Sequence, residues 1–308
     1  MNMQVIINQM IQLFLVIGLG YLLRKLGLFD QGLNKKLSTL LLQVTMPAMV
    51  LSAVLKADNS VGLSQLSTIF IVSIAAYLLL PLLGLLLNFI LRVPKPQKGL
   101  YLFMTTFGNV GFMGFPVMNA IFGSQAMLYT AIFNMFFNLF LFTMGAAMMQ
   151  MGSGEKFQLN LKKLISPGVL SALAALLIYL LKIPCPLILA DTVELIGSVT
   201  TPLAMLVIGS TLASMPLKEV FNDIRVHLYS ILKQLAFPLL LYPLLRWLIA
   251  DELLLGVSLI LLAMPVANAA VLFSTEYGRD QKLAAKSVFL TTLLSAIVIP
   301  LLVYLFLI

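Results

Sequence analysis

Long apolar stretches separated by short polar connections follow one another along the whole chain. A membrane-spanning helix needs about 20 mostly apolar residues, and uncharged runs of about that length recur from one end to the other. The uncharged run 99–154 is too long for one helix, and a turn signal, Phe122-Gly123-Ser124-Gln125, divides it. The pattern therefore predicts an all-α integral membrane protein with ten transmembrane helices, at 5–23, 38–55, 67–91, 99–121, 125–150, 165–181, 192–214, 226–248, 254–275 and 286–307.

Basic residues are concentrated in alternate connections between these helices. The opposite side holds only Lys56, Lys182 and Arg246. We expect Lys233 and Arg246, toward opposite ends of the eighth helix, to extend to the two membrane interfaces. Because cytoplasmic connections carry the Lys and Arg excess, the pattern predicts a multi-pass protein of the bacterial inner membrane with both termini periplasmic. The residues assigned to the cytoplasmic side are Arg24, Lys25, Lys35, Lys36, Arg92, Lys95, Lys98, Lys156, Lys162, Lys163, Lys218, Arg225, Lys233, Arg279, Lys282 and Lys286.

The composition excludes a soluble enzyme. Hydrophobic residues make up 61% of the chain and charged residues 10%, against about 45–50% and about 25% in soluble domains. Cys185 and His227 are the only cysteine and histidine, too few for a metal cluster or a catalytic triad, and no phosphate-binding P-loop occurs. We therefore expect no enzymatic activity, no metal and no cofactor. The net charge of +8 fits membrane topology and gives no reason to expect nucleic-acid binding.

Two short motifs recur at corresponding places in the two halves of the chain. Pro116-Val117-Met118-Asn119-Ala120, in the fourth predicted helix, reappears 149 residues later as Pro265-Val266-Ala267-Asn268-Ala269 in the ninth. Val44-Thr45-Met46-Pro47, in the second, reappears 155 residues later as Val199-Thr200-Thr201-Pro202 in the seventh. Both matches pair a helix with the fifth helix after it, which indicates an internal repeat.

An odd number of helices per repeat requires the second half to be inverted in the membrane relative to the first. We therefore divide the chain into a first repeat at 1–151, a short cytoplasmic linker at 152–164 and a second repeat at 165–308. Inverted repeats with broken helices at the membrane midplane are typical of secondary transporters.

The fourth and ninth helices have the features of such broken helices. Gly108, Gly111, Gly114 and Pro116 fall within nine residues, a poor sequence for a continuous helix. Proline is favoured in the first turn of a helix, where its missing N–H is no loss. We therefore expect the second half-helices to begin at Pro116 and Pro265.

Asparagines near these prolines are the predicted binding groups. Asn119 and Asn268 would lie in the first turn of each half-helix, where free backbone N–H groups and the helix dipole favour an anion. Because the repeats are inverted, the two half-helices would face each other and line one pocket, with Asn109 as a third candidate. The alternative for all three is a hydrogen bond that holds helices together, and this packing role is our interpretation of Asn134 and Asn138.

The run from Gly108 to Pro116 and the paired Pro-Val-x-Asn motifs resemble the crossover helices of the auxin efflux carrier family, which includes the plant PIN carriers and many bacterial permeases. The resemblance covers essentially the whole chain. It implies a fold similar to those of bile-acid transporters and sodium–proton antiporters. It also implies an elevator mechanism, in which helices 3–5 and 8–10 form a transport domain that moves against a scaffold of helices 1, 2, 6 and 7.

The resemblance also implies site residues and a substrate class. Asn119 and Asn268 would bind the substrate, and Met46 would face it from the scaffold. The substrate would be a small organic anion such as malate, malonate or an auxin-like acid. We further expect a homodimer through the scaffold helices. The connection 150–163 is too short for the regulatory segment of long-loop plant members, so no such control is implied.

No acidic residue falls in the middle of a predicted helix, although a sodium or proton coupling site usually needs an intramembrane carboxylate. The membrane potential alone, at about 2.3 kcal/mol per charge per 100 mV, could drive efflux of a monoanion. We therefore predict a secondary transporter of a small organic anion. A sodium- or proton-coupled symporter or antiporter of the same fold is the alternative within transport. A membrane enzyme or receptor is the alternative outside it, although the sequence shows neither a catalytic cluster at membrane depth nor an extramembrane domain.

Overall fold

The computed structural model describes residues 3–55, 62–151, 167–214 and 223–307. Over these residues the chain is helical apart from short turns and one isolated β-bridge. The elements in chain order are α1 (Met3–Lys25), α2 (Gln31–Leu40), η1 (Leu41–Thr45), α3 (Met46–Leu55), α4 (Leu63–Ile90), η2 (Lys95–Gln97), α5 (Lys98–Thr106), η3 (Val110–Gly114), α6 (Phe115–Phe122), η4 (Ser124–Ala126), α7 (Met127–Phe140), η5 (Leu141–Gly145), α8 (Ala146–Gln150), α9 (Pro167–Leu181), α10 (Leu187–Ser198), α11 (Thr200–Ala213), α13 (Ile224–Ile231), η7 (Leu232–Ala236), α14 (Phe237–Leu248), α15 (Glu252–Leu262), α16 (Ala269–Glu276) and α17 (Gln281–Phe306).

Seven helical stretches of the described residues are long and apolar enough to cross a bilayer. They are α1, α2 with η1 and α3, α4, η4 with α7, η5 and α8, α10 with α11, α13 with η7 and α14, and α17. Three shorter apolar helices accompany them, namely η3 with α6, α9, and α15. Helices of this length and composition make the chain a multi-pass membrane protein.

Widened π-helical turns precede three of the prolines. η1 ends two residues before Pro47, η3 two residues before Pro116, and η7 two residues before Pro238. Proline lacks an N–H, and in an α-helix its ring collides with the carbonyl four residues earlier. A π turn bonds residue i to i+5 and so opens the helix at that point. Each helix therefore continues through its proline instead of ending there.

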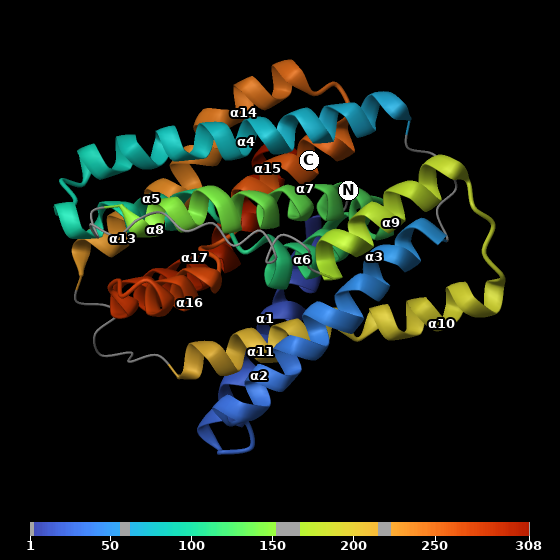
Figure 1. Cartoon of the computed structure of the whole chain (residues 1–308), viewed down its shortest axis with the longest axis horizontal. Coiled ribbons are helices and arrows are strands. Elements are labelled where there is room, and N and C mark those ends of the chain that lie inside the picture. Colours follow the sequence, from blue (N-terminus) through green and yellow to red (C-terminus); the bar gives the residue numbers. More distant parts are fainter. Residues whose placement is uncertain (1–2, 56–61, 152–166, 215–222, 308) are drawn as a thin grey trace.

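The helices pack in two groups. In the first group α1 packs along α11, and α3 packs against both α9 and α10. In the second, α4 packs against α5, α7 and α15, and α17 packs against α13, α15 and α16. Figure 1 shows α4 and α14 along one side of the molecule and α2, α10 and α11 along the opposite side. Contacts of α6 with α1 and of α7 with α3 and α9 join the two groups.

Glycines allow α1 and α11 to lie unusually close. A β-carbon at Gly20 would collide with the carbonyl of Leu206, and one at Gly209 would collide with the carbonyl of Ile17. Each helix therefore places a glycine against the backbone of the other. Small residues at such an interface are what helix association in a membrane requires, because backbone-to-backbone packing replaces the hydrophobic effect there.

Candidate functional site

Two breaks in the helices lie at the centre of the second group. α5 ends at Thr106, and helical structure resumes at Val110 in η3. α15 ends at Leu262, and α16 begins at Ala269. Each break leaves a helix end, with unbonded backbone groups, inside the protein.

The two unwound segments pair with each other. Gly108 and Val266 form an antiparallel β-bridge. Hydrogen bonds flank it on both sides, from the amide of Asn109 to the carbonyl of Pro265 (2.7 Å) and from the amide of Ala267 to the carbonyl of Phe107 (3.0 Å). The Val266 amide donates to Thr291 Oγ1 of α17 (3.0 Å). The breaks thus cross and satisfy much of each other's exposed backbone, as buried polar groups require.

Gly108 is at the tightest part of this crossing. A β-carbon there would lie 3.2 Å from Met264 Cβ and 3.3 Å from the Met264 carbonyl oxygen. The other two glycines predicted for this break, Gly111 and Gly114, lie in the π turn that follows it. Pro265 does not begin the second half-helix, as the sequence had predicted, because α16 begins only at Ala269; it lies in the break itself and contributes its carbonyl to the crossing.

Asparagines immediately precede both helices that leave the crossing. Asn109 comes just before η3 and Asn268 just before α16. Neither side chain caps its own helix, so both amides remain available to another partner. Asn109 is buried and Asn268 half-buried. The first N–H groups of a helix have no partner within it, and its N-terminus carries partial positive charge. Two such ends therefore present donors around the crossing.

The structure places Asn119 differently from the sequence prediction. The helix begins at Val110 and not at Pro116, because the π turn of η3 accommodates the proline ring without a break. Asn119 therefore lies nine residues into the helix, about 13 Å from its start at 1.5 Å per residue, and is exposed. In the structure the counterpart of Asn268 is Asn109.

Met46 reaches the start of η3 from the other group of helices. A β-carbon at Gly111 would lie 3.8 Å from Met46 Cε and 3.7 Å from Asn134 Oδ1 of α7. Met46, predicted to face the substrate from the second helix, therefore borders the first turn after the break. Asn134, interpreted as a packing residue, has its amide oxygen at the same place. Asn138 donates to the Asn134 backbone carbonyl at 2.8 Å.

The sequence predicts that Lys233 extends to the membrane interface, but the structure places it inside the protein. It lies in the π turn η7 with only 3% of its surface exposed, and its Nζ donates to the carbonyl of Met264 at 2.7 Å. Arg246, by contrast, is exposed and pairs with Glu252. The prediction for Lys233 was wrong because position along the chain does not show which way a side chain points, and η7 turns this one inward. The signal available in the sequence was a single charged residue inside an apolar segment, five residues before Pro238.

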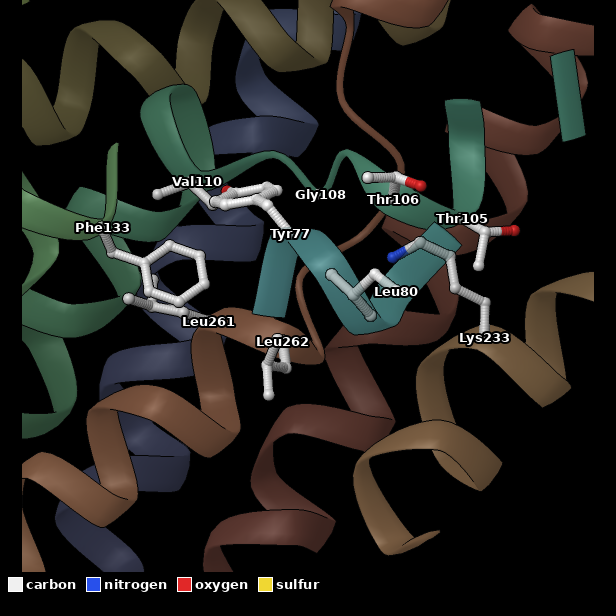
Figure 2. A pocket seen from close by; sticks show the side chains of 10 residues that line it. All are labelled: Tyr77, Leu80, Thr105, Thr106, Gly108, Val110, Phe133, Lys233, Leu261 and Leu262. Atoms are coloured by element: carbon white, nitrogen blue, oxygen red, sulfur yellow. The ribbon is translucent and has the colours of Figure 1, made fainter. Parts of the chain in front are cut away.

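A small cavity lies beside the crossing. Figure 2 shows Lys233 extending its ammonium between Leu80 and Thr106 toward Gly108. The cavity has about 10 Å³ of space for water centres, roughly enough for one water molecule. It is too small for an organic acid. Met46 and Gly111 border a part of the crossing that faces the first helix group.

Comparison with known families agrees with this architecture. The family model described as "Membrane transport protein" matches residues 5–303, nearly the whole chain. The chain belongs to this family. It is the auxin efflux carrier family that the crossover motifs resemble. The protein is therefore a membrane transporter and not an enzyme.

Relatives of this transporter span almost its full length. A protein of Methanocaldococcus jannaschii described as an uncharacterized transporter is 26% identical over 299 residues, covering 95% of this chain and 96% of the relative. An uncharacterized transporter of Methanothermobacter thermautotrophicus is 24% identical over 290 residues, covering 92% of each. A protein of Rhizobium meliloti named "Putative malonate transporter" is 26% identical over 300 residues, covering 95% of this chain and 93% of the relative.

Proposed function

We propose that this protein is a secondary transporter of a small organic anion, and that the anion binds where the two broken helices cross. The observation that carries the proposal is the pairing of Gly108 with Val266, because it brings the starts of η3 and α16 to one place. Each start offers a positive dipole end and an asparagine amide, although the Val110 and Ala270 N–H groups already donate to the carbonyls of Gly108 and Ala267. Such half-helix ends receive anionic substrate groups in other secondary transporters.

The transporter moves its site by an elevator mechanism, with ten helices in two inverted repeats. Seven long stretches and three shorter apolar helices among the described residues support this proposal. The first, second, sixth and seventh membrane spans are the scaffold; they correspond to α1, α2 with α3, α9, and α10 with α11. The close contact of α1 with α11 and of α3 with α9 and α10 supports this division. The third to fifth and eighth to tenth spans form the moving domain, which contains the crossing of α5–η3 with α15–α16. The scaffold also provides the surface for a homodimer. The protein lies in a bacterial inner membrane with both termini periplasmic.

The substrate is a small carboxylate. Backbone N–H groups and neutral amides recognise a carboxylate oxygen without needing a paired side-chain cation at the contact. Met46 then provides an apolar surface beside the anion, and Gly111, which has no side chain, leaves the backbone of its turn accessible. The name of the Rhizobium meliloti relative makes malonate the first compound to test, followed by malate and indole-3-acetate.

Binding to purified protein in detergent tests the proposal. Asn109→Ala and Asn268→Ala each remove a donor to a charged group, worth roughly 1.5–3 kcal/mol or about 10- to 150-fold in affinity. Asn119→Ala, nine residues beyond the start of η3, is expected to leave the affinity unchanged and serves as the matched control. Stabilisation by malonate, malate or indole-3-acetate in a thermal-shift measurement supplies the readout. Wild-type affinity in both Asn109→Ala and Asn268→Ala would show that the anion binds elsewhere.

A coupled symporter or antiporter is the second candidate. The described part of the chain has no group of three or more metal-ligating side chains, but backbone carbonyls alone can hold sodium. Transport by the uncoupled carrier responds to an imposed voltage and only weakly to a sodium gradient. A strict sodium requirement at fixed voltage, measured in proteoliposomes, would favour the symporter.

A further inference from the structure

The crossing has a second side, formed where α15 ends. The carbonyls of Ala263 and Met264, the first two residues after α15, lie there. The π turn η7 places two consecutive side chains against them. Lys233 Nζ donates to the Met264 carbonyl at 2.7 Å, and Gln234 Nε2 approaches the Ala263 carbonyl at 3.5 Å.

The groups gathered here are those that bind a monovalent cation. The C-terminal end of a half-helix carries partial negative charge, and unwound carbonyls beside it coordinate sodium in other carriers. Gln234 lies beside these carbonyls, and its Oε1 is fully buried with no hydrogen-bond partner among the described residues, the Lys233 ammonium included. A buried acceptor without a donor costs free energy unless a cation or donor is near.

The ammonium of Lys233 is held here without a counter-ion. No carboxylate pairs with it among the residues that the structure describes; the Met264 carbonyl is its hydrogen-bond partner. An unpaired buried charge is costly, and an apolar residue in its place is often neutral or stabilising. The neighbouring cavity holds about one water molecule, so an organic anion does not fit beside the ammonium. The contact that the structure gives this charge is therefore the Met264 carbonyl.

We propose that the crossing contains a monovalent-cation site at the Ala263 and Met264 carbonyls, and that the chain occupies it with the ammonium of Lys233, which donates to the Met264 carbonyl. The protein thus carries its own cation at the place where a coupled carrier would bind sodium. If the proposed anion transport holds, this resident charge lies behind the half-helix ends and partly balances a bound anion. Transport then needs no cation from solution.

Sodium binding to a lysine-free variant tests this inference without any substrate. Lys233→Ala removes the ammonium and leaves space for an ion. Melting temperatures are measured in detergent with NaCl or with N-methyl-D-glucamine chloride at equal ionic strength. We expect sodium to raise the melting temperature of Lys233→Ala by several degrees and to leave wild type unchanged. Lys286→Ala, which removes a half-buried lysine of α17, is the matched control and should not respond. An equal response of Lys233→Ala and Lys286→Ala to the two salts overturns the proposal.

A second variant decides the question where Lys233→Ala cannot be purified in either salt. Lys233→Met keeps the volume of the side chain and removes its charge. If the ammonium serves as the resident cation, Lys233→Met lowers the melting temperature, and sodium does not restore it because methionine fills the space. A melting temperature at or above that of wild type shows that the carbonyls need no cation, and overturns the proposal. Neither measurement uses an organic anion, so failure here leaves the binding test of Asn109 and Asn268 unaffected.

Discussion

Gly108 and Val266 come from breaks in two different helices and face each other as an antiparallel β-bridge. The amide of Asn109 on one side and of Ala267 on the other complete the pairing, at 2.7 and 3.0 Å. A crossing held by backbone bonds depends little on which side chains surround it, except where the two chains approach most closely. That place is Gly108, and the first prediction concerns it.

Replacing Gly108 by alanine should destabilise the crossing. Its β-carbon would press on the Met264 β-carbon and carbonyl at 3.2 and 3.3 Å. Overpacking of this kind costs roughly 1–3 kcal/mol, which we expect as a lower melting temperature in detergent. Gly111→Ala is the control, because its nearest neighbours would lie at an ordinary 3.7 and 3.8 Å. A larger loss of stability in Gly111→Ala than in Gly108→Ala would contradict the described crossing.

The contact between α1 and α11 should be the part of the first helix group most sensitive to added volume. Gly209→Ala places a methyl group against the Ile17 carbonyl and forces the two helices apart. We expect a loss of roughly 1–3 kcal/mol or more. Gly18→Ala, two residues before Gly20 on α1, meets nothing within 4 Å, and should be neutral or stabilising by up to about 1 kcal/mol through helix propensity. Melting temperatures of the two variants in one detergent provide the comparison.

Arg279 should stabilise the junction between α8 and α16. Its Nε donates to the Met149 carbonyl at 2.6 Å, and its Nη2 donates to the Met151 carbonyl at 2.8 Å. Arg279→Ala leaves the carbonyls at the end of α8 without these donors, at a cost of roughly 1–3 kcal/mol. Arg279→Lys should recover less than half of the loss, because an ammonium cannot reproduce the two-pronged geometry of the guanidinium. Full recovery by lysine would show that charge alone matters.

Reporter fusions should reveal both ends of the chain on the periplasmic side. With Lys233 inside the protein, the basic residues divide 15 to 3 between the two sides, still a strong cytoplasmic excess. A fusion after Met151 should therefore be active as a cytoplasmic reporter, and alkaline phosphatase after Ile308 should be active. A cytoplasmic Ile308 would mean an odd number of spans and would falsify the inverted repeat.

The sequence alone determined that the chain is an all-helical membrane transporter. Apolar runs and charge-poor helices are local properties, because a bilayer accepts only segments that satisfy their own backbone bonds and lack charge. The glycine-rich run around Gly108 likewise marked a broken helix, since it is a poor helix former wherever it lies. The family could be recognised because such motifs recur with their spacing.

Tertiary structure decided where the site residues lie. Pro116 was expected to begin a half-helix, but a π turn accommodates it, so Asn109 and not Asn119 stands at the break with Asn268. Whether a proline breaks or merely widens a helix depends on the packing around it, which no local pattern contains. Lys233 is the sharper case. Its hydrogen bond joins residues 31 positions apart, and only the fold could show that a cation inside an apolar helix reaches the crossing instead of the membrane surface.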